Sequence, residues 1–192
     1  MTADEVVAEI SRRAWRFGVA VLLYPEVNVD CDGLPAGGYF DEDKMVLAVA
    51  TGRKTDTWLG VLLHEYCHLT QFIEGQPSWA AYKNDLWEWL EGKSIKDAAA
   101  SLESVRTVEA DCERRAIRLA RELDAPIDLD RYARASNAYL HFHNVLLNER
   151  KWIRKGVVLG EREDVLKLCN STIDKDFSKT PVKLYKALLT CV

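Results

Sequence analysis

The chain has 192 residues, the size of one ordinary domain with its own hydrophobic core. Apolar residues make up 48% and charged residues 29%, a balance typical of a globular protein. The net charge of −4 provides no electrostatic basis for binding nucleic acid or an anionic membrane, and no apolar run approaches the roughly 20 residues of a membrane span. We therefore expect neither nucleic acid nor a membrane among its partners.

The cysteines and the N-terminus indicate the compartment. There are five cysteines, scattered and without a Cys-x-x-Cys pair, at Cys31, Cys67, Cys112, Cys169 and Cys191. This pattern argues against a disulfide scaffold and against a Cys-rich structural zinc site. The acidic start, Met1 to Glu5, lacks the basic and apolar regions of a secretory signal. A cytoplasmic protein is the resulting expectation.

The first fifty residues predict one helix followed by a small sheet. Apolar side chains recur at helical spacing from Val6 to Phe17, and Gly18 ends that helix. Strands are predicted at 19–24, with a continuation at Val27 and Val29, and then at 39–40 and 45–50, the last two joined by an acidic turn. We expect a mostly antiparallel sheet with the 45–50 strand at an exposed edge.

A helix is predicted next, from about Thr57 to Ile73, with Thr55 or Asp56 as its cap and Gly75 after its end. The remaining signals predict a helix from Ser78 to Leu90, a long helix from Ser94 to about Leu123, a helix from Asp128 or Asp130 to about Trp152, a short strand at 157–159, and short helices at 161–168 and 181–189. The fold class is therefore α+β, mostly helical. We expect a single domain over 1–192, with a core of about 1–152 and a C-terminal extension over 153–192.

The helix after the sheet contains His64-Glu65-Tyr66-Cys67-His68, a match to H-E-x-x-H. Residues four apart share one helical face, so His64 and His68 can offer two ring nitrogens to one metal ion. Glu65 lies about 100° round the helix from His64, close enough to reach a metal-bound water as general base. Zinc is the expected ion, because it lowers the pKa of that water towards 7. Cys67 is expected to be a packed, free thiol.

A catalytic zinc usually needs a third protein ligand. Glu74 would point away from the histidine face, which makes it a poor candidate. Glu109 lies on the apolar stripe of the long helix, where a carboxylate is costly unless it is paired or bound to metal. We expect Glu109 to be the third ligand and Glu113, one turn later, to accept the second ring N–H of His64 or His68.

Alternatives to this ligand set remain open. Glu113 is the main rival of Glu109 as ligand, and Asp111 is a distant one. The two glutamates could instead pair with Arg106, Arg114 or Arg115 on a solvated face.

The helix after Asp130 provides candidate groups for stabilising an oxyanion. Tyr139 and His143 lie one turn apart on the same face, whereas His141 points elsewhere. Asn137 is a weaker candidate. The alternative is that Tyr139 is a core residue and His143 an ordinary polar helix residue.

The order of these motifs resembles the gluzincin arrangement of zincin-like metallopeptidases, in which H-E-x-x-H is followed by E-x-x-x-D/E on a second helix. Here the second element is Glu109 to Glu113, with Glu in place of the more usual Asp. Gly38 to Phe40 and Asp111 to Arg115 also resemble segments of predicted phage and bacterial metallopeptidase-like proteins. The resemblance covers about 37–152. It implies a zincin-like fold, with Glu109 on zinc and Glu113 supporting a zinc-binding histidine.

Three functions are compatible with these residues. The first is a zinc metallopeptidase with Glu65 as base and a peptide or protein substrate, which would pair with the edge strand at 45–50 by strand addition. The second is a non-catalytic, zinc-stabilised protein-interaction module. The third is a deformylase-like hydrolase with Cys31 as third ligand, although the glycine and leucine surroundings expected there are missing.

Overall fold

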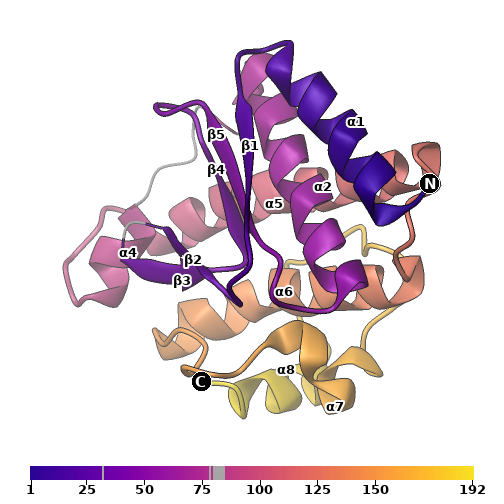
Figure 1. Cartoon of the computed structure of the whole chain (residues 1–192). Coiled ribbons are helices and arrows are strands. Elements are labelled where there is room, and N and C mark those ends of the chain that lie inside the picture. The colour runs from indigo at the N-terminus through magenta and orange to yellow at the C-terminus, as the bar shows by residue number, and fades with distance from the viewer. Residues whose placement is uncertain (32, 78, 80–84) are drawn as a thin grey trace. The chain divides into compact units, whose positions relative to one another are not determined.

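The structure, a computed structural model, describes residues 1–31, 33–77, 79 and 85–192. It divides the chain into two compact units, residues 1–76 with 112–129 and residues 77–111 with 130–192. Helices predominate beside a small, mostly antiparallel sheet, so the predicted α+β class is confirmed (Figure 1).

Helix α1 (Ala3–Trp15) opens the first unit. Thr2 and Glu5 form a capping box at its start, since each side chain bonds the other residue's backbone N–H. Val6, Ile10 and Ala14 form its buried face, as predicted. The helix ends at Trp15, so Phe17 lies in the following turn and is 42% exposed rather than part of that face.

The sheet of the first unit has three strands in the order β1 (Ala20–Tyr24), β5 (Val46–Ala50), β4 (Gly38–Asp41). Strand β1 runs parallel to β5, whereas β4 is antiparallel to it. A separate antiparallel pair consists of β2 (Val29–Cys31) and β3 (Leu34–Ala36). The expectation that the 45–50 strand lies at an exposed edge is wrong, because β5 is hydrogen-bonded on both sides and four of its five residues are buried.

Helix α2 (Thr55–Ile73) packs against β4 and β5, and α1 and α2 lie on one side of the sheet (Figure 1). The predicted caps Thr55 and Asp56 are wrong: the helix begins after Lys54, which makes no side-chain cap bond. Gly38 explains how closely helix and strand approach. A Cβ atom there would lie 2.7 Å from Val61 Cγ1 and 3.2 Å from Glu65 Cγ, so only glycine fits without displacement.

Helix α5 (Ala98–Glu122) contributes residues to both units. Its N-terminal turn is capped by Asp97, whose Oδ1 accepts a 2.9 Å bond from the Ala100 N–H, so the predicted start at Ser94 is wrong. The predicted apolar stripe is buried along its whole length, at Leu102, Val105, Cys112, Ala116, Leu119 and Leu123.

The second unit contains α4 (Asp85–Leu90), α6 (Leu129–Glu149), the 3-10 turn η1 (Leu159–Glu161), α7 (Glu163–Leu166) and α8 (Val182–Leu189). The predicted strand at 157–159 is wrong, since η1 begins there, and α6 ends before Trp152. The predicted cap Ser78 lies outside the described residues. Residues after 153 pack on α6 and complete its core, with Leu166, Leu184 and Leu188 against Phe142 and Leu146.

Polar side chains of α6 bind the segment at 170–180. Asn137 donates to the carbonyls of Asn170 and Thr172, and Asn144 donates to that of Phe177. This accounts for the burial of Asn137 without a site role. Within the described residues, no helix has both the length and the apolar composition that a membrane crossing requires.

Candidate metal centre

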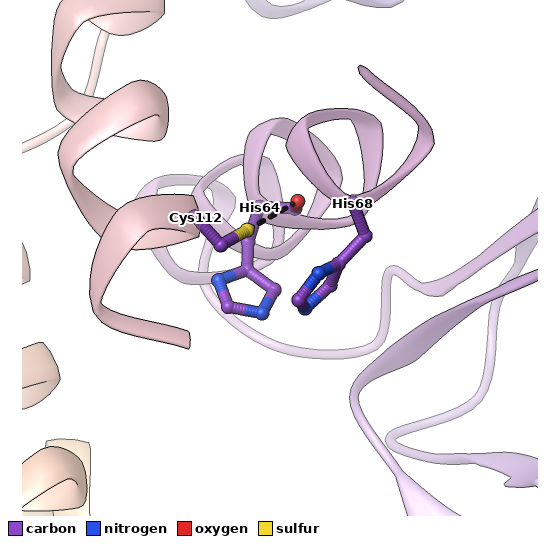
Figure 2. A group of neighbouring side chains, drawn as sticks. All are labelled: His64, His68 and Cys112. Atoms are coloured by element: carbon purple, nitrogen blue, oxygen red, sulfur yellow. Dashed lines mark hydrogen bonds between the residues drawn. The ribbon is translucent and has the colours of Figure 1, made fainter. Parts of the chain in front are cut away.

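The two histidines of the motif lie side by side on α2, inside the first unit. Their ring centroids are 4.5 Å apart and their planes meet at 87°. Both rings project from the same side of the helix, and His68 is only 8% exposed (Figure 2). Two imidazoles on one helical face are the arrangement from which a single metal ion can take two ligands.

Each ring has an oxygen acceptor near its Nδ1 atom. His68 Nδ1 lies 2.9 Å from Gln71 Oε1, and His64 Nδ1 lies 3.4 Å from Glu113 Oε1. With an acceptor at Nδ1, the proton of a neutral ring lies there and the lone pair lies on Nε2. Nε2 is then the atom of each ring through which a cation would be bound. This is the donor chemistry that zinc prefers, so the residues fit the expected ion.

Glu113 is buried, at 7% exposure, although it is a carboxylate. Its Oε2 atom has no hydrogen-bond partner among the described residues, while Oε1 faces His64. A buried carboxylate in this setting is stabilised by a positive charge close by. A cation on the histidines would supply one.

Cys112 on α5 is the third residue of the group that could hold a metal. The Nδ1 or Nε2 atoms of the histidines and the Cys112 sulfur lie within 4.8 Å of one another. The Cys112 thiol donates a 3.1 Å bond to the backbone carbonyl of His64. Figure 2 shows the sulfur beside the helix backbone, at the root of the His64 ring rather than at its tip. The hydrogen bond explains the position of the thiol.

Glu65, the expected base, follows His64 on α2 and is 8% exposed. Its Cγ atom faces Gly38, so strand β4 at the sheet edge adjoins this side chain. Glu74, by contrast, is solvent-exposed and pairs with Arg115 at the end of the same helix. Cys67 is buried as a free thiol.

The other predicted site residues belong to the second unit. Glu109 is buried, at 6% exposure. The rings of Tyr139 and His143 meet edge to face, with their centroids 4.9 Å apart. Burial lowers the pKa of His143 to about 4, although the negative charge of Glu109 opposes that shift. Neither ring nitrogen of His143 has a hydrogen-bond partner in the described part of the chain. The ring is therefore neutral at physiological pH.

The polar alternatives considered for these residues find their own partners. Arg106 bonds the Asn144 side chain and the Phe177 carbonyl, and Arg115 bonds Thr70 as well as Glu74. His141 points elsewhere, as expected, with Nε2 3.0 Å from Asp174 Oδ2. The structure thus groups His64, Glu65, His68 and Glu113 in one unit and Glu109, Tyr139 and His143 in the other.

The sequence did not predict the contacts that two residues, Gln71 and Cys112, make with the histidines. Gln71 has no role among the sequence predictions, although a glutamine three residues after His68 on one helix lies within reach of its ring. Cys112 was assigned to the apolar stripe, which is correct for its burial but says nothing of its bond to His64.

Comparisons with protein-family models, with curated proteins and with solved structures found no match. The resemblance to gluzincins therefore stays a prediction, and the functional argument depends on the residues themselves.

Proposed function

We propose that the chain is a zinc-dependent hydrolase that cleaves peptide bonds. The observation that carries the proposal is the pair of imidazoles, His64 and His68, on one helical face, each with an oxygen acceptor near its Nδ1 atom. Glu65 stands beside them on the same helix. A purely structural zinc site has no use for such a carboxylate.

Zinc, when bound, supplies a Lewis acid and brings the pKa of a coordinated water towards 7. His64 and His68 hold the ion through Nε2, while Glu113 and Gln71 hold the rings. Glu65 takes the proton from the attacking water and passes it to the leaving amine. Tyr139 and His143 are the proposed donors to the oxyanion of the tetrahedral intermediate.

The third ligand is Glu109 in this proposal. The argument is its buried position on α5, at 6% exposure, because binding to a metal ion is one of the ways in which a buried carboxylate is stabilised. Cys112 is the alternative ligand, because its sulfur belongs to the group around the histidines. Its bond to the His64 carbonyl favours a supporting role instead.

The substrate is proposed to be an extended peptide. Strand β4 lies at the edge of the three-stranded sheet and adjoins Glu65 through Gly38. An extended chain can add to such an edge by main-chain hydrogen bonds, which would bring its carbonyl groups past the base. The edge strand that receives the peptide is therefore β4, and not the 45–50 strand expected from the sequence.

Glu65→Gln is the test of the mechanism. We expect zinc to remain bound while hydrolysis of a quenched fluorescent peptide library falls by about 10²- to 10⁴-fold, because only the proton acceptor is lost. Glu74→Gln makes the same change at an exposed position of the same helix region and should leave the rate unaltered. Unchanged hydrolysis in Glu65→Gln would refute the mechanism.

A second candidate is a non-catalytic module stabilised by zinc. The burial of His68 and Cys112 favours it, because closed structural sites commonly combine histidine and cysteine ligands. In that case zinc removal lowers the melting temperature, and wild type and Glu65→Gln are equally inactive.

A further inference from the structure

Gln71 is a polar residue in an unusually apolar position. It lies on α2 and its side chain is fully buried, as are those of the core residues Leu63 and Leu69 in the same helix. Burying a primary amide costs free energy unless its oxygen and nitrogen find partners. Its Oε1 atom has one, the Nδ1 atom of His68 at 2.9 Å.

This contact determines which nitrogen of His68 carries the proton. An amide oxygen can only accept a hydrogen bond, so the imidazole must donate from Nδ1. A neutral imidazole has one N–H group and one lone pair, which leaves the lone pair on Nε2. A metal ion binds the lone pair. The contact therefore selects both the tautomer and the orientation of the ring.

The two histidines are supported in different ways. Glu113 approaches His64 from another helix, α5, with a carboxylate at 3.4 Å, whereas Gln71 approaches His68 from its own helix with a neutral amide at 2.9 Å. A second carboxylate, against His68, would add to the negative charge that Glu113 already places against His64. A neutral acceptor fixes the ring without that repulsion.

We infer that Gln71 is a positioning residue of the metal centre, holding His68 in the Nδ1–H tautomer with Nε2 directed at the ion. The inference rests on the proposed zinc site, of which it deepens one ligand. Partners of this kind typically contribute 10- to 100-fold to metal affinity.

Gln71→Met tests the inference by removing the acceptor at nearly constant volume. We expect zinc affinity, measured by competition with a chromophoric chelator, to fall about 10- to 100-fold. Gln71→Glu keeps an acceptor oxygen and should bind zinc more tightly than Gln71→Met. Gln76→Met, the same change just beyond the helix, should bind as the wild type does. Wild-type affinity in Gln71→Met overturns the inference.

A second measurement needs no variant. The ring ¹⁵N shifts of His68 in the zinc-free wild type, recorded at a pH where the ring is neutral, report its tautomer directly. We expect Nδ1–H, and a ring protonated at Nε2 overturns the inference even if Gln71→Met does not fold. The outcomes also separate the two proposals: a wild type that binds no zinc refutes the proposed function, whereas the tautomer is decided independently.

Discussion

Replacing Gly38 by alanine should destabilise the first unit and displace Glu65. The added Cβ atom would lie 2.7 Å from Val61 Cγ1, 2.8 Å from the Ala48 carbonyl oxygen and 3.2 Å from Glu65 Cγ. The first two distances are shorter than van der Waals contact, and the Ala48 oxygen belongs to the backbone of the central strand. Relief therefore requires β4 to move away from α2. Overpacking of this kind costs about 1–3 kcal/mol.

Gly37→Ala is the matched control. A Cβ atom there would lie 3.5 Å from Val61 Cγ2 and 3.9 Å from Val61 Cγ1, which is ordinary contact. Both substitutions reduce the freedom of the unfolded chain by the same amount, about 0.4–1 kcal/mol in favour of folding. The difference between the two variants therefore isolates the steric cost.

Urea unfolding at equilibrium measures that difference. We expect Gly38→Ala to be less stable than Gly37→Ala by about 1–3 kcal/mol, at an unchanged m-value. Under the proposed function, peptide hydrolysis should also fall more in Gly38→Ala, because Glu65 is displaced. Equal stability of the two variants would contradict the close approach of β4 and α2.

Two further predictions concern the buried ionisable groups. Glu109→Gln should lower zinc affinity by at least tenfold. Cys112→Ala should bind zinc as the wild type does and lose about 1 kcal/mol of stability, as small buried truncations do. If a zinc titration shows the loss of affinity in Cys112→Ala and not in Glu109→Gln, Cys112 is the ligand. The pKa of His143 lies at about 4 when folded and near 6.5 when unfolded, so the unfolded chain binds more protons between these values. The free energy of unfolding should therefore fall as pH drops from about 6.5 to 4, by at most ~1.4 kcal/mol per pH unit from this group. The fall should be steeper in wild type than in His143→Phe. Parallel pH profiles of the two proteins would refute a buried neutral ring.

Helical periodicity was the most informative part of the sequence. It located α1, α2, α5 and α6, and it identified the buried stripe of α5, on which Glu109 and Glu113 are indeed buried at 6% and 7% exposure. Burial of a helix face follows from spacing alone, because the side chains that share a face recur every three or four residues.

Features that depend on distant contacts were not predictable in this way. Strand order is one. Strand β1 pairs in parallel with β5, although β2, β3 and β4 come between them in the sequence, and no local pattern encodes that pairing. Helix starts are another, since Lys54 and Asp97 replaced the expected caps. The bond between Gln71 and His68 differs from these, because it joins residues one helical turn apart and only the burial of Gln71 needed the structure.

The most direct test of the proposed zinc centre is the X-ray absorption spectrum of the protein loaded with one equivalent of zinc. We predict two imidazole rings and oxygen ligands at about 2.0–2.2 Å from the metal, with no sulfur near 2.3 Å. A sulfur shell would replace Glu109 by Cys112. A spectrum that lacks two imidazoles, or a protein that binds no zinc, would contradict the assignment of His64 and His68 as the metal ligands.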